Sequence, residues 1–244
     1  MRTVANQLAS GGTIRMADPG SQKIRWQLRY SDLTDSERAS IENLFEAAGG
    51  QLNTFTFLDP TGNLLTWSED WTQTAWTADP LLQVSGGAQD PLGGSEAMQL
   101  TNTAQTAQQI IQSIGASSTF THCYSLYVRS SVPATVQMVV TATGQTLLTP
   151  VTTGSAWTRV TTSRSLLVEG AGVGFGVQLP AGAQVDAFGA QVEAQPAAGL
   201  YKKTIDRGGV YPSTRFSSDL LSFTATAPNQ NSCQIDLISS LGGA

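Results

Sequence analysis

One stretch of the chain has the apolar spacing of an α-helix, and an expected strand lies on either side of it. Thr34 and Glu37 form the S/T-x-x-E capping box that begins a helix. Gly49 and Gly50 end it, because glycine accepts the left-handed conformation of a helix C-cap. Between these ends, an apolar stripe with i, i+3, i+4, i+7 spacing is formed by Ile41, Leu44, Phe45 and Ala48. The stretch therefore predicts one amphipathic helix that must bury a face.

Apolar and polar residues alternate before this helix, which is the pattern of a half-buried strand. The alternation runs from Lys23 to Tyr30, and a second apolar run after the helix stops at the turn residues 59–62. A strand, a helix and a strand form an α+β unit, but this unit buries too little to be stable alone. The side chains expected to form its core are Trp26, Leu28, Ile41, Leu44, Phe45, Phe55 and Phe57.

Charge is spread unevenly along the 244 residues, and this marks the expected domain boundaries. Residues 64–200 contain three arginines, no lysine and eight acids, a net charge of −5, whereas the rest of the chain has ten bases and ten acids. We therefore predict a discontinuous domain, 1–63 with 201–244, and an inserted domain, 64–200. The insertion falls at an exposed turn, a kind of site that tolerates inserted domains.

The inserted segment lacks helical periodicity and reads as a series of short strands. Runs rich in β-branched residues alternate there with clusters of Gly, Ser, Asn and Pro, which predicts a β-sandwich or jelly roll. Three more strands are expected after residue 200, and Ile41, Leu44 and Phe45 should contact them. The predicted fold class is mainly β: a small α+β domain, a sheet with one helix, interrupted by an all-β jelly-roll or sandwich domain.

Composition argues against several kinds of partner. An acidic chain without a basic cluster does not favour nucleic acid. No apolar run approaches the roughly 20 residues of a membrane helix, and the start, MRTVANQLASGG, lacks a signal-peptide core. We expect a protein made in the cytoplasm, without membrane insertion and without a cofactor. Two cysteines do not define a disulfide framework or a zinc site, so Cys123 and Cys233 are expected to be unpaired.

Aromatic and acidic residues gather at the start of the inserted segment. Aromatic rings that stack on sugars beside carboxylates that bind hydroxyls are typical of glycan sites, but buried aromatics also dominate cores, and both interpretations stay open. The candidate glycan-binding residues are Trp67, Trp71, Trp76, Glu69 and Asp70. Trp157, in an expected strand, is assigned to the core. Asp186 and Glu193 could hold a structural calcium, but no Asp-rich loop supports it and no metal site is predicted.

Catalytic signatures are absent from the sequence, so we predict a protein that is not an enzyme and has no catalytic residues. His122 is the single histidine, and the adjacent Cys123 points to the opposite face of an expected strand. Residues 170–176, GAGVGFG, do not begin a helix and are predicted to form a glycine-rich strand instead of a phosphate loop.

Two resemblances cover most of the chain. LRYSDLTDSERASIENLFEAAGGQLNTFTFLDP and GGVYPSTRFSSDLLSFTATAPNQNSCQIDLI resemble the opening and closing parts of tailed-phage distal tail and minor tail proteins. NLLTWSEDWTQTAW, GSAWTRVTTS and AFGAQVEAQPAAGLYKKT are similar to carbohydrate-binding-module-like jelly rolls of phage tail and receptor-binding proteins.

The resemblances imply a structural protein of a phage tail tip or baseplate, made in the host cytoplasm and located in the virion tail. Its split domain would assemble a homo-oligomeric ring and bind other tail proteins, namely the tail tube and the tip or hub. Its sandwich would face outward and contact host surface glycans. The short flanking domain departs from the family, which puts a full ring-forming barrel in doubt. Two alternatives stay open: a stand-alone glycan-binding adhesion module and a hydrolase of surface polysaccharide.

Overall fold

The computed structural model describes residues 2–7, 10, 12–18, 22–170 and 172–241. The chain forms two compact units. One, the split unit, consists of Met1–Phe57 and Tyr211–Ala244, and the other, the sandwich unit, is Leu58–Val210. The fold is mainly β, and α1 is the one helix among the described residues, so the predicted fold class is confirmed.

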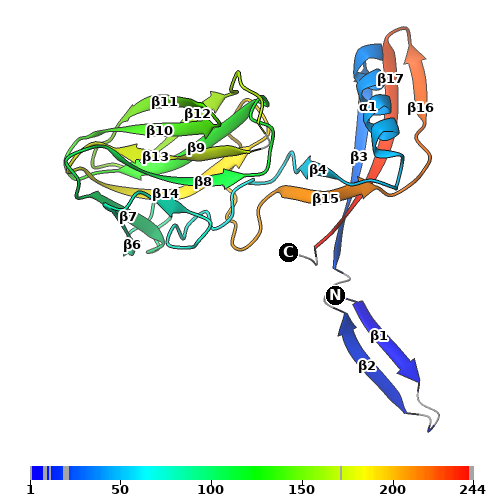
Figure 1. Cartoon of the computed structure of the whole chain (residues 1–244), viewed down its shortest axis with the longest axis horizontal. Coiled ribbons are helices and arrows are strands. Elements are labelled where there is room, and N and C mark those ends of the chain that lie inside the picture. The colour runs from blue at the N-terminus through cyan, green and yellow to red at the C-terminus, as the bar shows by residue number, and fades with distance from the viewer. Residues whose placement is uncertain (1, 8–9, 11, 19–21, 171, 242–244) are drawn as a thin grey trace. The chain divides into compact units, whose positions relative to one another are not determined.

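The split unit contains a sheet with α1 packed on it. The sheet order is β16-β17-β15-β4, and β3 pairs with β17 along its whole length (Figure 1). A separate antiparallel hairpin, β1–β2, precedes β3. The elements are β1 (Arg2–Gln7), β2 (Thr13–Asp18), β3 (Lys23–Leu33), α1 (Asp35–Ala48), β4 (Phe55–Leu58), β15 (Val210–Phe216), β16 (Phe223–Ala227) and β17 (Gln230–Ser240).

Both predicted ends of α1 are present in the structure. The Thr34 hydroxyl accepts a hydrogen bond from the Glu37 amide at 3.2 Å, and the Glu37 carboxylate accepts one from the Thr34 amide at 2.8 Å. The Thr34 amide and the Thr34 hydroxyl both donate to the Glu37 carboxylate and hold the pKa of this carboxyl below its usual value. At the other end, Gly49 adopts φ 61°, the left-handed conformation.

The core of the split unit joins the two ends of the chain. Phe45 of α1 contacts Phe216 of β15, with ring centroids 4.9 Å apart, and Trp26 of β3 contacts Phe57 at 4.9 Å. Six of the seven expected core residues pack in this cluster, namely Trp26, Leu28, Ile41, Phe45, Phe55 and Phe57. Leu44 is instead 45% exposed, because the face of α1 that packs on the sheet is formed by Ile41, Phe45 and Ala48.

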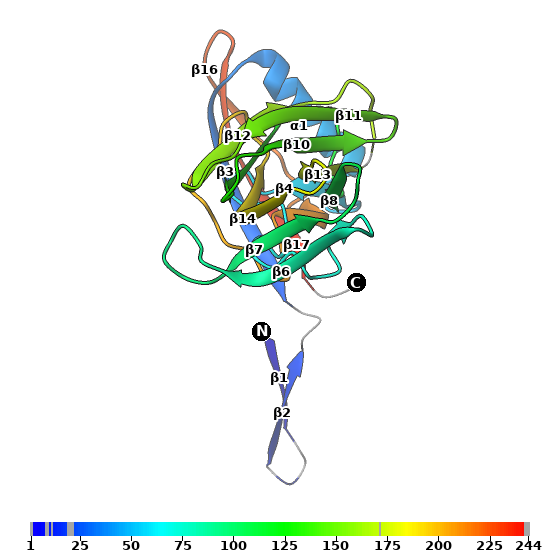
Figure 2. The ribbon, with the colours of Figure 1, turned by 90° about the vertical axis from the view of Figure 1, so that its left-hand side faces the viewer.

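The sandwich unit consists of two five-stranded antiparallel sheets, β11-β10-β13-β8-β5 and β12-β9-β14-β7-β6. The chain crosses between the sheets at every connection except the hairpins β6–β7 and β10–β11, a jelly-roll type of winding. Figure 2 shows β6 and β7 side by side. The strands are β5 (Thr77–Ala78), β6 (Leu82–Ala88), β7 (Ala97–Asn102), β8 (Gln108–Ile114), β9 (His122–Arg129), β10 (Thr135–Ala142), β11 (Gln145–Thr152), β12 (Thr158–Arg164), β13 (Val173–Leu179) and β14 (Gln184–Glu193).

The core of the sandwich unit is continuous and includes the ring of Phe175, which contacts His122 and Tyr124. His122 is buried, and burial lowers the pKa of its imidazole. Cys123 and Cys233 are free thiols, as expected, and burial raises the pKa of both. The glycine-rich run supplies β13, a central strand of its sheet, and not a phosphate loop.

The two ends of the sandwich unit lie side by side. The Asp59 amide donates to the Gly209 carbonyl, and the Gly209 amide donates to the Asn63 carbonyl, each at 2.8 Å. Asn63 is buried and also donates to the Lys202 carbonyl. The expected boundaries were 63 and 201, whereas these contacts place residues 58–63 and 201–210 in the sandwich unit. Among the described helices, none is long and apolar enough to span a membrane.

Candidate functional site

Trp71 and Trp76, two of the candidate glycan-binding residues, lie in the sandwich core. Trp71 is 2% exposed, and its ring stacks on that of Trp76 with centroids 4.7 Å apart. Both indole N–H groups donate to backbone carbonyls, that of Ser68 and that of Trp67, at 3.1 Å. Neither ring has a face available for a sugar.

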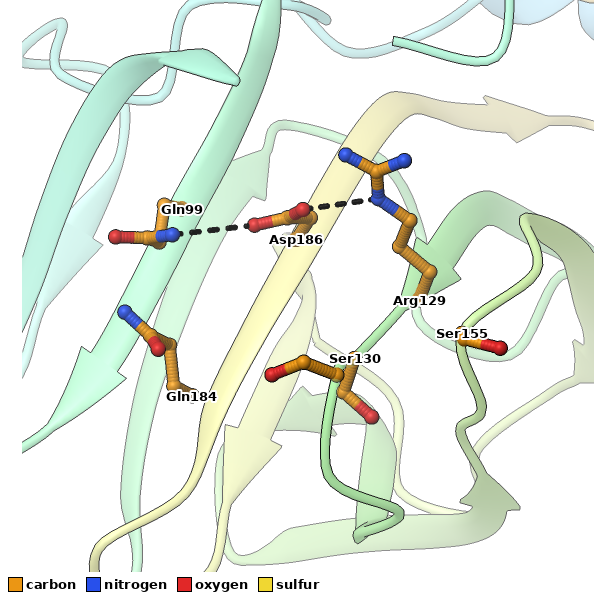
Figure 3. Close-up of a pocket in the computed structure, with 7 residues that line it drawn as sticks. Gln99, Arg129, Ser130, Ser155, Gln184 and Asp186 are labelled. Carbon is orange, nitrogen blue, oxygen red and sulfur yellow. Dashed lines mark hydrogen bonds and ion pairs between the residues drawn. The ribbon is translucent and has the colours of Figure 1, made fainter. Parts of the chain in front are cut away.

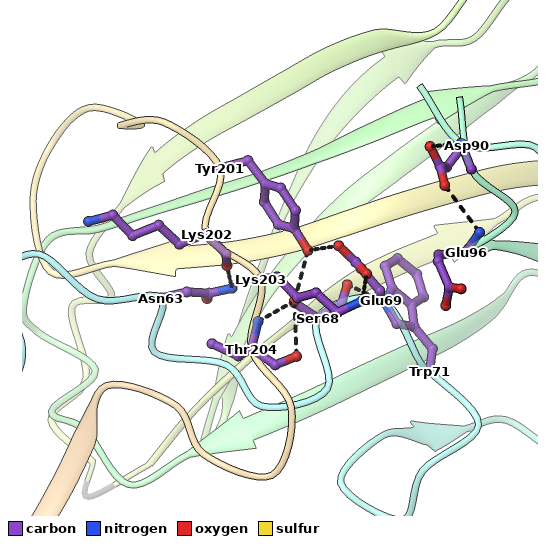
Figure 4. Close-up of polar contacts among 11 residues, drawn as sticks. Asn63, Ser68, Glu69, Trp71, Asp90, Glu96, Tyr201, Lys202, Lys203 and Thr204 are labelled. Carbon is purple, nitrogen blue, oxygen red and sulfur yellow. Dashed lines mark hydrogen bonds and ion pairs between the residues drawn. The ribbon is translucent and has the colours of Figure 1, made fainter. Parts of the chain in front are cut away.

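The two candidate acids nearby also have protein partners. Glu69 is buried, accepts a hydrogen bond from the Tyr201 hydroxyl at 2.9 Å and pairs with Lys203 (Figure 4). The Thr72 hydroxyl and the Gln73 amide donate to Asp70 and hold the pKa of its carboxyl below the usual value.

The contacts of Glu69 with Tyr201 and Lys203 join the start of the sandwich unit to its end. Burial raises the pKa of the Tyr201 hydroxyl, and the hydrogen bond to Glu69 raises the pKa of Lys203. Trp67, the remaining candidate, is half-buried against the core. The five candidate residues therefore lie near one another, but they do not line an open groove.

An open polar groove lies instead on the outer face of the sheet that contains β9 and β14. Strand alternation directs Val128 and Ala187 into the core and their neighbours Arg129 and Asp186 outward, and these two outward residues are paired across the strands. The groove has a volume of about 290 Å³ (Figure 3). It is lined by Gln99, Arg129, Ser130, Ser131, Ser155, Gln184 and Asp186.

An ion pair forms the centre of this groove. The Arg129 Nε donates to an Asp186 oxygen at 2.9 Å, and Gln99 donates to the other Asp186 oxygen at 3.5 Å (Figure 3). The Arg129 guanidinium lies over the ring of Trp157, 4.7 Å from the ring centroid. Its two terminal nitrogens have no hydrogen-bond partner among the described residues, so they are available to a ligand.

The groove presents the chemistry that recognises a polyhydroxylated molecule. A guanidinium supplies donors in a fixed fork, a carboxylate accepts, and carboxamides and hydroxyls do both. Mutual pairing of Arg129 and Asp186 leaves the site without net charge, which suits a neutral ligand. The Trp157 ring restricts the movement of the Arg129 guanidinium through a cation–π contact.

Sequence reasoning missed most of this groove. It placed Trp157 in the core, whereas the residue is half-buried just before β12 and contacts Arg129. It considered Asp186 and Glu193 for calcium, but Asp186 pairs with Arg129, and Glu193 accepts hydrogen bonds from Gly199, Gln191 and Gln195. Within the described residues, no cluster of three or more His, Cys, Asp or Glu could hold a metal ion.

The signal that could have pointed to the groove was the scarcity of basic residues in the inserted segment. Arg129 is one of three bases between residues 64 and 200. Opposite charges on neighbouring strands stabilise a sheet, so an arginine in an alternating strand of such a segment is a candidate for a cross-strand pair. The sequence alone does not say which strand that is.

Comparisons with known proteins found similar folds. No family model and no curated protein sequence matches the chain. The CBM22-1 xylan-binding domain of Paenibacillus barcinonensis Xyn10C is similar over 59% of this chain and 95% of its own, at 17% identity and TM-score 0.43. The CBM22-1–CBM22-2 tandem domain of the same protein is similar over 70% of this chain and 60% of its own, at 17% identity and TM-score 0.47. The enzymatically active domain of bacteriophage CBA120 tailspike protein 4 is similar over 56% of this chain and 22% of its own, at 9% identity and TM-score 0.45. Similarity at this level carries no argument about function.

Proposed function

We propose that the sandwich unit binds a neutral glycan in the groove centred on Arg129 and Asp186. The observation that carries this proposal is the guanidinium of Arg129, a residue that lines the groove: Asp186 and Trp157 hold it, and its terminal nitrogens have no hydrogen-bond partner among the described residues. A donor fork held in one place loses little conformational entropy when a ligand binds. Strand residues, not loops, position both charged groups, so the site is formed before the ligand arrives.

Replacing Arg129 by methionine should weaken glycan binding by about tenfold to a hundredfold, because hydrogen bonds from a charged group contribute about 1.5–3 kcal/mol. Methionine keeps an apolar stem against Trp157 but removes all the donors. A glycan array with the purified protein identifies ligands, and calorimetry with the best ligand measures the affinities of both proteins.

Arg164→Met is the matched control, because Arg164 is an exposed arginine on β12 of the same sheet and does not line the groove. It should bind like the unaltered protein. Release of reducing ends from the same ligands separates binding from hydrolysis. If no saccharide is retained by the intact chain, or if the two arginine variants lose affinity equally, the glycan proposal is wrong.

We also propose that the split unit assembles copies of the chain into a structural ring of a phage tail tip, where the protein would contact tail tube and hub proteins. One structural feature favours it beyond the resemblance of the two end segments to distal tail proteins. β3 is an 11-residue strand that pairs with β17 on one side, and no described strand pairs with its other edge. Long unpaired edges are templates for strand addition by another chain.

The split unit should form oligomers even when the sandwich unit is removed. Phe57 and Tyr211 both contact Trp26, with centroids 4.9 Å and 4.6 Å away, so a short Gly-Ser linker can replace residues 58–210. Sedimentation should find oligomers for the full chain and for the linked split unit, and folded monomers for the isolated 58–210 fragment. A full chain that stays monomeric at all concentrations would contradict the ring.

A further inference from the structure

A second pocket adjoins the polar groove and has mostly apolar walls. It has a volume of about 460 Å³ and lies between the residues that connect β9 to β10 and those that connect β13 to β14. Ser131 and Gln184 line both spaces, so the two are adjacent. Its apolar walls are Val132, Pro133, Ala134, Pro180, Ala181 and Ala183.

Of these six apolar walls, only Ala183 packs against the hydrophobic core of the sandwich. Val132 is 72% exposed and lies outside the hydrophobic core cluster. Pro133 and Ala181 are also exposed. An apolar surface that begins where the polar groove ends suits a ligand whose polarity changes over the same short distance.

We propose that the ligand is a saccharide with an acetamido substituent, whose sugar ring occupies the polar groove and whose acetyl methyl group lies against Val132. This inference rests on the proposed glycan function and names the ligand class. An acetamido group has one N–H donor, one carbonyl acceptor and a methyl group. A carboxamide at the junction can pair with the first two, and an apolar wall beyond it can cover the third.

Gln184 is the carboxamide at this junction. Its amide nitrogen donates to the Thr101 hydroxyl at 3.3 Å, and its oxygen accepts no bond within the described residues. Figure 3 shows the side chain beside Gln99 and Asp186, at the side of the groove away from Ser155. An acetamido N–H can therefore donate to the Gln184 oxygen, and the same substituent then extends toward the apolar walls.

Charge on the unit favours this class over acidic saccharides. Residues 58–210 contain six bases and ten acids, a net charge of −4, which repels polyanions. The single guanidinium in the groove is already neutralised by Asp186. A substituent that adds apolar surface and hydrogen bonds without charge fits both pockets.

The test compares chitotetraose with cellotetraose, two β-1,4-linked chains that differ in the acetamido group in place of a hydroxyl. Calorimetry with the full chain should show chitotetraose bound about tenfold more tightly, the combined effect of one buried methyl group and one hydrogen bond. Val132→Ser should reduce this preference to about threefold or less, because it removes only the apolar contact.

Leu92→Ser is the control, because Leu92 is 73% exposed in the same unit and lines neither pocket. It should leave the preference unchanged. Equal affinity for the two ligands, tighter binding of cellotetraose, or a preference that survives Val132→Ser would overturn the acetamido inference while leaving glycan binding intact. Failure of the full chain to bind any glycan of an array would instead remove the proposed function itself, and the inference with it.

Discussion

Replacing Gly176 by alanine is expected to lower the free energy of unfolding of the sandwich unit by about 3 kcal/mol or more, at the upper end of the range for overpacked sites. Gly176 lies in β13, between β10 and β8. A Cβ atom at this position would overlap the Ile110 carbonyl oxygen and approach the Cα of Ile111. Since these are backbone atoms, no side-chain rotation can relieve the overlap, and β13 must separate from β8. Urea unfolding followed by fluorescence measures the loss.

Gly115→Ala is the control for this prediction, because Gly115 directly follows β8 and a Cβ there has no neighbour within 4 Å. The variant should stay within about 0.5 kcal/mol of the unaltered protein. A Gly176→Ala protein as stable as Gly115→Ala would mean that β13 does not approach β8 this closely. The refuting result is therefore read from two unfolding midpoints.

The glycine-rich run shows where sequence reasoning reaches its limit in the fold. That the run forms a strand was predicted because it does not begin a helix. That Gly176 faces the backbone of β8 did not follow, because a cross-strand approach depends on which strands are neighbours. Four strands, β9 to β12, lie between β8 and β13 in sequence, yet β8 and β13 are neighbours in the sheet, as the register of Ile110 with Val177 shows.

The helix was predictable for the opposite reason: its signals are local. Thr34 and Glu37 are three residues apart and cap the same turn, and Gly49 ends the helix through its own backbone conformation. No distant residue had to be known. The contact of Phe45 with Phe216 was predictable only as a general expectation, since an amphipathic helix between two strands needed a partner from elsewhere in the chain.

The candidate site needed information that local patterns do not contain. Arg129 and Asp186 are opposite each other because β9 pairs with β14, and no periodicity within either strand specifies that pairing. The tryptophans show a similar limit. The clustering of Trp67, Trp71 and Trp76 in sequence left a glycan site and a buried core both open, and in the structure the connection before β5 folds so that Trp71 and Trp76 are buried in the core.

Trp71→Ala should therefore destabilise the protein and leave the groove intact. Removal of a fully buried aromatic side chain costs about 3–5 kcal/mol, and Trp71 also loses its stacking on Trp76 and its bond to the Ser68 carbonyl. Under conditions where the variant is still folded, its affinity for a glycan ligand should equal that of the unaltered protein. Thermal unfolding and calorimetry on the same samples measure both quantities.

Trp157→Ala should have the opposite effects, a loss of glycan affinity with a smaller loss of stability. Trp157 is half-buried and supports the Arg129 guanidinium, so its loss should lower the affinity several-fold through a more mobile donor fork. Its effect on stability should be smaller than that of Trp71→Ala, because less surface becomes a cavity. If Trp71→Ala instead abolished glycan binding at unaltered stability, the Trp71 ring would belong to the ligand site, and the groove at Arg129 would not be that site. Opposite responses of the two tryptophans are what a buried core beside a separate polar groove requires.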